Sequence, residues 1–122
     1  MANVINWFEI PVADIQRATK FYSDVMDYEF TQQEMMGFKM AFFPMEGEGI
    51  GGSLIQGEGY IPSMTGAVVY LNGGEDLSVY LNRVEAAGGK IVFPKTKISD
   101  EIGYMAFFID SEGNRVAFHS LN

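Results

Sequence analysis

The sequence contains no cysteine. Without thiols, the chain can form neither disulfides nor thiolate metal sites, and it has no cysteine nucleophile. It also lacks an apolar run of membrane-spanning length, and its N-terminus lacks the basic and apolar regions of a signal peptide. These absences lead us to expect a soluble, cytoplasmic protein.

Basic residues are scarce. The chain has 8 Lys and Arg against 16 Asp and Glu, which gives a net charge of -8 and a pI near 4.4. A polyphosphate backbone or an anionic membrane would be repelled by this charge, so we expect neither nucleic acid nor membrane as a partner. The glycines form no phosphate-binding signature, and no nucleophile elbow surrounds any serine.

What the sequence does contain is an internal repeat. Residues 7–30 and 68–92 both show the pattern of a strand, an amphipathic helix and the start of a second strand. In the two copies, Asp14-Ile15 matches Asp76-Leu77. A chain of 122 residues is long enough for one domain, and a half of about sixty residues buries too little surface to be stable on its own. We therefore expect one domain over residues 1–122, with a first module at about 1–60, a second at about 61–122, and a ligand site enclosed between them.

The residue pattern predicts the order β-α-β-β-β in each module. The first helix begins after the N-cap Asp14 and stops near Met26-Asp27, with Asp27 in a left-handed conformation. The second helix, the clearest in the sequence, runs from Asp76 to Gly88-Gly89. Alternating apolar residues and turn signals predict strands at 4–11, 29–33, 38–43, 50–56, 67–72, 91–93, 104–109 and 115–120, with a crossover at 57–64 and a loop at 95–99.

Three stretches carry a resemblance to a known family: NWFEIPVADIQRATKFY, GGSLIQGEGYIPS and YMAFFIDSEGNRVAFHS. They resemble the vicinal oxygen chelate superfamily, which includes glyoxalases, bleomycin resistance proteins and extradiol dioxygenases. The resemblance covers nearly the whole chain. It implies an α+β fold of two tandem βαβββ modules, whose curled mixed sheets enclose a shared cavity.

Enzymes of that superfamily hold a divalent metal through four ligands, two from each module. In this sequence, the resemblance places those positions at Trp7, at or near Val68, at Ala117 and somewhere in 50–56. That last stretch has no His, Asp or Glu. Indole and aliphatic side chains cannot coordinate a hard or borderline cation. The sequence thus resembles the metal-free branch of the superfamily, and we expect neither a metal nor another cofactor.

The same positions define the face of each strand that should line the cavity, because side chains alternate along a strand. Glu9 then shares that face with Trp7, Tyr70 with Val68, and His119 with Ala117. Phe38, Met40 and Phe42, or their opposite-parity neighbours, should add apolar side chains from the first module's hairpin. Tyr104, with either Ala106 or Phe107, should add them from the second. An apolar lining with a few polar groups is typical of small-molecule sites. The candidate ligand-binding residues are Trp7, Glu9, Phe38, Met40, Phe42, Val68, Tyr70, Tyr104, Ala117 and His119.

Each polar candidate also has a purely structural interpretation. His119 fits a hydrogen-bonded strand residue, and it also fits a ligand or acid–base contact. A displaced metal site shared with Glu9 is a third interpretation, but it would be short of ligands. Glu9 is costly to bury unless it is paired, for which Arg115, Lys95 or His119 would serve. Trp7 could anchor the core or an interface as well as a ligand.

From the residues and the resemblance together, we expect a metal-independent protein that binds a small apolar or aromatic molecule and forms a homodimer. The alternative is a glyoxalase-related lyase or isomerase, in which Glu9 or His119 moves a proton beside a carbonyl. A third possibility is a scaffold protein whose cleft is filled by its own side chains.

Overall fold

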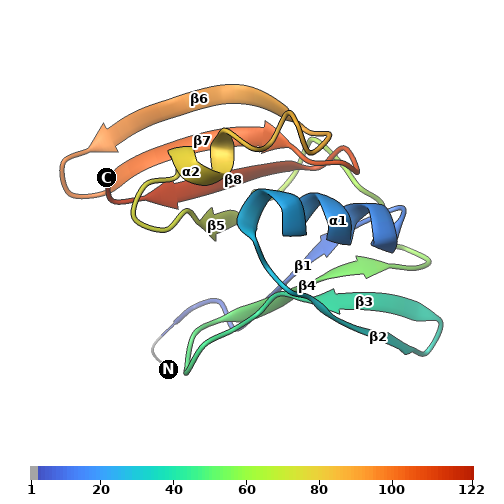
Figure 1. Cartoon of the computed structure of the whole chain (residues 1–122). Coiled ribbons are helices and arrows are strands. Elements are labelled where there is room, and N and C mark those ends of the chain that lie inside the picture. The colour runs from blue at the N-terminus through green and yellow to red at the C-terminus, as the bar shows by residue number, and fades with distance from the viewer. Residues whose placement is uncertain (1–2) are drawn as a thin grey trace.

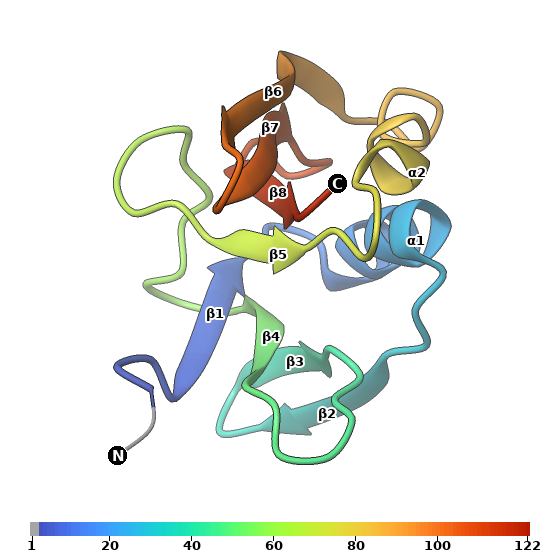
Figure 2. The ribbon, with the colours of Figure 1, turned by 90° about the vertical axis from the view of Figure 1, so that its left-hand side faces the viewer.

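The computed structural model describes residues 3–122, which form two separate four-stranded sheets (Figures 1 and 2). In spatial order, the first sheet is β1 (Trp7–Pro11), β4 (Gly51–Gln56), β3 (Phe38–Phe42) and β2 (Thr31–Met35), and the second is β5 (Tyr70–Asn72), β8 (Arg115–Ser120), β7 (Gly103–Ile109) and β6 (Lys90–Ser99). The pairs β1–β4 and β5–β8 are parallel and the others antiparallel. The expected α+β fold of two tandem modules with mixed sheets is confirmed.

Helix α1 (Ile15–Met26) begins and ends where the sequence predicts. The Asp14 side chain accepts hydrogen bonds from the backbone N–H groups of Gln16 and Arg17, which would otherwise lack partners at the helix start. Asp27 ends the helix with a φ of 57°, in the left-handed region. Six residues of α1 are buried, because its apolar side chains recur every three or four positions: Ile15, Ala18, Phe21, Tyr22, Val25 and Met26.

Helix α2 is much shorter than expected, and covers only Ser78–Leu81. Beyond it, Arg83 and Val84 donate to carbonyls three residues back, so the chain continues as tight turns rather than as an α-helix. The predicted apolar face is nonetheless used, since Leu77, Leu81 and Val84 are all buried. The periodicity therefore identified the buried side correctly but overestimated the helix.

The expected loop at 95–99 is also wrong, because β6 runs without interruption from Lys90 to Ser99. Pro94 lacks a backbone N–H and normally interrupts a strand. In β6, the pairing register with β7 shifts between Phe93 and Thr96, and this irregularity accommodates the proline at the sheet edge.

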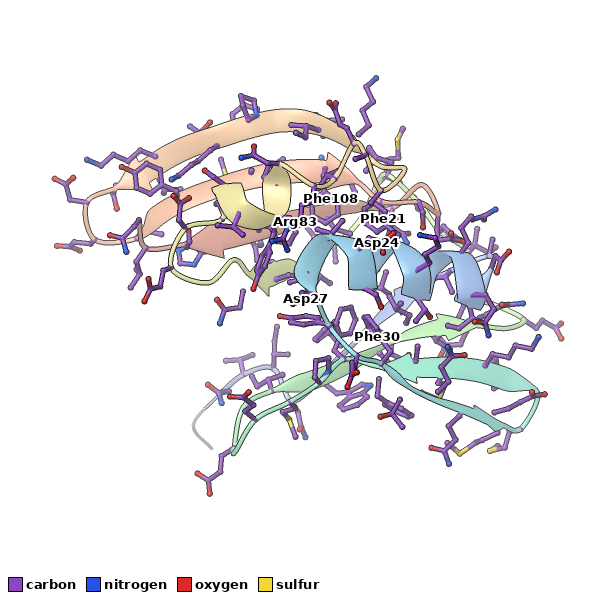
Figure 3. The ribbon with its side chains drawn as sticks, in the orientation of Figure 1. Phe21, Asp24, Asp27, Phe30, Arg83 and Phe108 are labelled. Carbon is purple, nitrogen blue, oxygen red and sulfur yellow. The ribbon has the colours of Figure 1, made fainter. Side chains whose placement is uncertain are left out.

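Helix α1 lies between the two sheets (Figure 1). Its Phe21 packs on Phe108 of β7, with 6.1 Å between ring centroids (Figure 3). Its Tyr22 packs on Phe43, just after β3, with 5.7 Å between ring centroids. Both sheets thus turn one side toward a common core, which the helices complete. The sheets are not closed around a shared cavity within the chain. None of the helices in residues 3–122 has the length and hydropathy that a membrane span requires.

The turn between β7 and β8 joins the two modules. Its Asp110, only 3% exposed, accepts a 2.7 Å hydrogen bond from the Tyr22 hydroxyl of α1. Asn114 donates to the Pro11 carbonyl at the end of β1 and accepts from the Ser63 N–H of the crossover. One turn of the second module therefore binds the helix, the first strand and the linker.

Glu112 of the same turn covers the start of α1. Its carboxylate accepts hydrogen bonds from the backbone N–H groups of Ala13 and Asp14, and from two nitrogens of Arg17, at 2.7–2.9 Å. Burial alone raises the pKa of Glu112, but these donors outweigh it and the pKa lies below its usual value. Negative charge at a helix start is also favoured by the helix dipole.

Replacing Glu112 with Gln should destabilise the fold by about 1–3 kcal/mol at pH 7, because charge-assisted hydrogen bonds across the module boundary are weakened. The lowered pKa means that this stabilisation is present above the unfolded-state pKa and is lost as the pH falls through the folded-state value. The stability gap between wild type and variant in urea unfolding should therefore narrow from pH 7 to pH 3. Exposed Glu85, changed to Gln, is the control; an equal gap at both pH values would contradict this account.

Candidate functional site

The predicted site residues of the first module lie on the side of its sheet that faces away from α1. Trp7 pairs with Gly51, Glu9 with Ser53, and Phe42 with Ser53, so these side chains share one face. The Trp7 and Phe42 rings lie 6.0 Å apart. Phe38 and Met40 have the same strand parity as Phe42, so the structure brings all five predicted residues of this module together: Trp7, Glu9, Phe38, Met40 and Phe42.

A second group lies on the outward face of the other sheet. Tyr70 pairs with Ala117, and His119 follows two residues along the same face of β8. Phe107 pairs with Ala117, and its ring lies 5.9 Å from that of Tyr70. Phe93 of β6 extends this row, with its ring also 5.9 Å from Phe107. Val68 lies just outside β5, two residues before its first residue, Tyr70.

The structure does not place Tyr104 with these residues. Tyr104 pairs with Ser120, which belongs to the helix-facing side of β8, and it packs against the core. The Lys95 ammonium lies 4.6 Å from the centroid of its ring. Spacing along one strand does not show which of its two faces is outward. The pairing of Met105 with His119 and of Phe107 with Ala117 puts Met105 and Phe107 on the outward face instead.

Glu9 has a partner that its own strand did not reveal. One carboxylate oxygen accepts a 2.9 Å hydrogen bond from the hydroxyl of Tyr60, in the crossover. This bond is the main reason that the pKa of Tyr60 is raised, with burial second. Within residues 3–122, Glu9 forms no ion pair with Arg115, Lys95 or His119, so its negative charge is not neutralised.

His119 is held by a backbone group. Its Nε2 lies 2.5 Å from the carbonyl oxygen of Ile102, the residue before β7. A carbonyl can only accept, so Nε2 carries a proton. In the neutral imidazole, Nδ1 then keeps a lone pair that can accept a hydrogen bond or a proton. The side chain is fixed in orientation without being deeply buried.

The residues at the superfamily's metal positions do not fit a divalent cation. Pairing in the second module sets Ala117 beside Tyr70, and the equivalent pairing in the first module sets Ser53 beside Glu9. The fourth metal position is therefore Ser53. Its hydroxyl oxygen is the only side-chain atom with a lone pair for a cation in the set formed with Trp7, Val68 and Ala117, because the indole nitrogen is a hydrogen-bond donor only. Zinc and similar ions require several N, O or S donors. No group of three His, Asp or Glu residues within 3–122 could hold a metal ion elsewhere.

Within one chain, the two outward faces point away from each other, because α1 occupies the space between the sheets (Figure 1). They approach each other at a small cavity of about 270 Å³, beneath the crossover. Its lining includes Glu9, Ile10, Pro11, Ile61, Ser63, Thr65, Ala67, Val69, Asn114, Arg115 and Val116. Glu9 is the one predicted site residue that lines this cavity.

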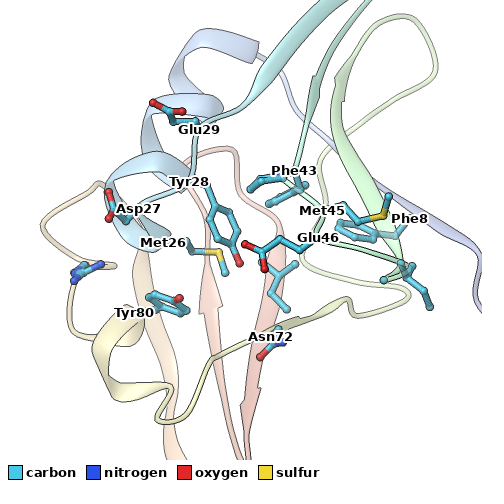
Figure 4. A pocket seen from close by; sticks show the side chains of 15 residues that line it. Phe8, Met26, Asp27, Tyr28, Glu29, Phe43, Met45, Glu46, Asn72 and Tyr80 are labelled. Atoms are coloured by element: carbon cyan, nitrogen blue, oxygen red, sulfur yellow. The ribbon is translucent and has the colours of Figure 1, made fainter.

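A larger open groove of about 1100 Å³ lies near the end of α1. Tyr28 and Glu46 point into it from opposite walls (Figure 4). Its lining also includes Phe8 and Phe43 from the helix-facing side, and none of the predicted site residues. Arg83, at its rim, donates a hydrogen bond to the Val25 carbonyl at the end of α1.

Sequence reasoning missed Ser53 and Tyr60 as members of these faces, and treated Arg115 only as a partner for Glu9. It named Phe107 only as an alternative to Ala106. Ser53 could have been found by aligning the two modules through Ala117. Arg115 could have been found from its parity with Ala117 and His119 on one strand. Tyr60 lies in an irregular segment, where no periodicity shows the direction of a side chain.

Comparisons with known proteins agree with this architecture. A family model described as "Glyoxalase/Bleomycin resistance protein/Dioxygenase superfamily" matches residues 4–118. A "Glyoxylase-like domain-containing protein" of Didymella fabae is 30% identical over 118 residues, which cover 90% of this chain and 88% of that protein.

Solved structures share the fold. A glyoxylase/bleomycin resistance protein/dioxygenase domain from Frankia sp. EAN1pec superposes with a TM-score of 0.74 at 14% identity, covering 98% of each chain. A V278E mutant of glyoxalase I from Zea mays superposes with a TM-score of 0.71 at 18% identity, over 94% of this chain. This chain spans only 45% of that maize protein.

Proposed function

Because the chain belongs to the Glyoxalase/Bleomycin resistance protein/Dioxygenase superfamily, we propose that it binds a small aromatic or apolar molecule against the outward faces of its sheets, without a metal ion. The observation that carries this proposal is the aromatic surface on those faces. Trp7 and Tyr70 are 45% and 50% exposed, and each lies beside another aromatic ring. Exposed apolar patches of this kind mark binding sites.

The polar groups on these faces are few and fixed in position. Glu9 is held by Tyr60, and His119 by the Ile102 carbonyl. A largely apolar surface with a few oriented polar groups suits a small organic ligand, which gains affinity from burial and orientation from the polar contacts. The net charge of -8 argues against nucleic acid or an anionic membrane as the partner.

We further propose that the site is completed by a second copy of the chain. One chain presents its two aromatic faces in different directions, so neither face is covered by the other. A symmetric homodimer could set the Trp7 face of one subunit opposite the Tyr70 face of its partner, and would do so twice. Such pairing would bury apolar side chains that are exposed in one chain and enclose a ligand between them.

Metal independence is supported by the side chains at the superfamily's metal positions, and not by the fold, which metal-dependent members share. The four positions at which the superfamily's enzymes coordinate metal hold one serine hydroxyl and three side chains without donors for a cation. A mechanism in which a cation polarises substrate oxygens therefore has no support from these residues.

Ligand binding can be followed through Trp7, the only tryptophan. The neutral quencher 4-nitrobenzyl alcohol should reduce its fluorescence saturably in the presence of EDTA. Tyr70→Ala should raise the Kd about three- to tenfold, because a stacking surface is lost. Val79→Ala, which removes an exposed apolar side chain from α2, is the control and should leave the Kd unchanged. Binding that EDTA abolishes, or the absence of saturable quenching, would contradict the proposal.

The assembly makes a separate prediction. Wild-type protein should sediment as a dimer in analytical ultracentrifugation. Phe93→Asp, on the outward face of the second sheet, should weaken dimerisation at least about tenfold, because a charge would be buried at the interface. Val79→Asp adds the same charge at a position outside both faces and should remain dimeric. A monomeric wild type would exclude the two-chain site.

A second function is favoured by one observation, the fixed imidazole of His119. With Nε2 bonded to a carbonyl, Nδ1 of the neutral ring can act as a general base toward a ligand on the same face. The class of reaction would be removal of a proton beside a carbonyl, as in an isomerase or lyase, with Glu9 as the other candidate base.

Exchange of carbon-bound protons distinguishes this enzyme from a binding protein. If His119 is a base, wild-type protein in D₂O should incorporate deuterium beside the carbonyl of phenylpyruvate or a related 2-oxo acid, as detected by ¹H NMR. His119→Gln should reduce the exchange rate about 10²- to 10⁴-fold, whereas Glu9→Gln tests the other candidate. No exchange above the buffer rate would leave binding as the function.

A further inference from the structure

Arg115 lies on the outward face of β8, and its side chain is partly buried without a counter-charge within residues 3–122. Its Nε is inaccessible to solvent and has no hydrogen-bond partner within residues 3–122. It also takes part in none of the ion pairs in that range. A buried N–H group of a charged side chain that lacks an acceptor is costly, and such groups are rare in native structures.

The guanidinium is nevertheless held in place. Its Cζ lies 5.6 Å from the ring centroid of Phe107, which favours a cation over the ring face. Phe107 is also the central ring of the row that contains Tyr70 and Phe93. Arg115 therefore stands at the end of the aromatic surface to which the proposed function assigns the ligand.

Arg115 also lines the cavity of about 270 Å³ beneath the crossover. The backbone of this wall is fixed by hydrogen bonds: Arg115 N–H donates to the Ser63 carbonyl, and Ser63 N–H donates to Asn114. The cavity is thus a built space with a cation at one wall, and its volume is sufficient for a carboxylate group and a few further atoms.

We propose that this cavity is an anion subsite, in which Arg115 binds the carboxylate of an aromatic acid whose ring lies on Tyr70 and Phe107. The inference rests on the proposed function, since it assigns a charge to the ligand of that site. A guanidinium binds a carboxylate through parallel N–H···O bonds, and an acid bound in the cavity would supply the counter-charge that Arg115 lacks within residues 3–122.

Glu9 is the other charged residue that lines the cavity, and it opposes an anion. Its hydrogen bond from Tyr60 draws one carboxylate oxygen toward the crossover, and no ion pair joins it to Arg115. Two variants should therefore have opposite effects. Removing the positive charge of Arg115 should weaken the preference for an acid over its neutral amide, and removing the negative charge of Glu9 should strengthen that preference.

The test compares phenylacetate with phenylacetamide, its neutral analogue of nearly equal shape, by calorimetry on the full chain at pH 7.5 with EDTA. Wild-type protein should bind the acid at least about tenfold more tightly than the amide, equivalent to about 1.4 kcal/mol. Arg115→Gln should reduce that ratio to about one, and Glu9→Gln should increase it. Lys97→Gln, a control that removes one exposed positive charge from β6, should leave the ratio unchanged.

Arg115→Lys guards against misfolding of the Gln variant, because it keeps the charge and loses only the planar fork. It should retain a reduced preference for the acid. The Nε–H signal of Arg115 in ¹⁵N-labelled wild-type protein should also shift on addition of phenylacetate and not of phenylacetamide.

Equal binding of acid and amide by wild type, or a preference that survives in a folded Arg115→Gln variant, overturns the anion subsite and leaves the aromatic site intact. Failure of both probes to bind, together with no saturable quenching of Trp7 by 4-nitrobenzyl alcohol, overturns the proposed function itself.

Discussion

The hydrogen bond between Tyr22 and Asp110 is the constraint on which the arrangement of the two modules depends. Both groups are nearly inaccessible to solvent, and burial is the main reason that the pKa of each is raised. A buried carboxylate is tolerated only when its oxygens are satisfied, and Asp110 accepts from Tyr22, Asn114 and two backbone N–H groups. If the turn moved away from α1, the Tyr22 hydroxyl would lose its acceptor inside the core. The position of the helix and the position of the turn are therefore fixed together.

That constraint determines where the site can be. With α1 held between the sheets, the helix-facing sides form the core, and the opposite sides, which carry most of the candidate site residues, are left uncovered by the helices. The aromatic side chains on these sides contact neighbours in their own sheet and leave one surface open. The same packing that stabilises one chain thus prevents that chain from closing a cavity between its own sheets.

Much of this architecture could be predicted from local pattern. Alternation along β1 placed Trp7 and Glu9 on one face, and the cap at Asp14 fixed the start of α1. Prediction failed where tertiary contacts override local preference. Pro94 suggested a loop, but pairing with β7 through a register shift keeps β6 extended. The second helix was too long because its apolar period also fits a series of tight turns, which bury the same residues.

The sequence by itself determined the chemistry available: no thiols, one imidazole, no metal donors at Trp7 or Ala117, and two strand–helix repeats that bury one side of each sheet. These follow from residue identity and spacing along a single strand or helix. Only the tertiary structure decided which distant groups meet, because hydrogen bonds such as Glu9–Tyr60 and His119–Ile102 join segments with no shared periodicity. It also decided that the two aromatic faces diverge, since that depends on α1 packing against both sheets at once.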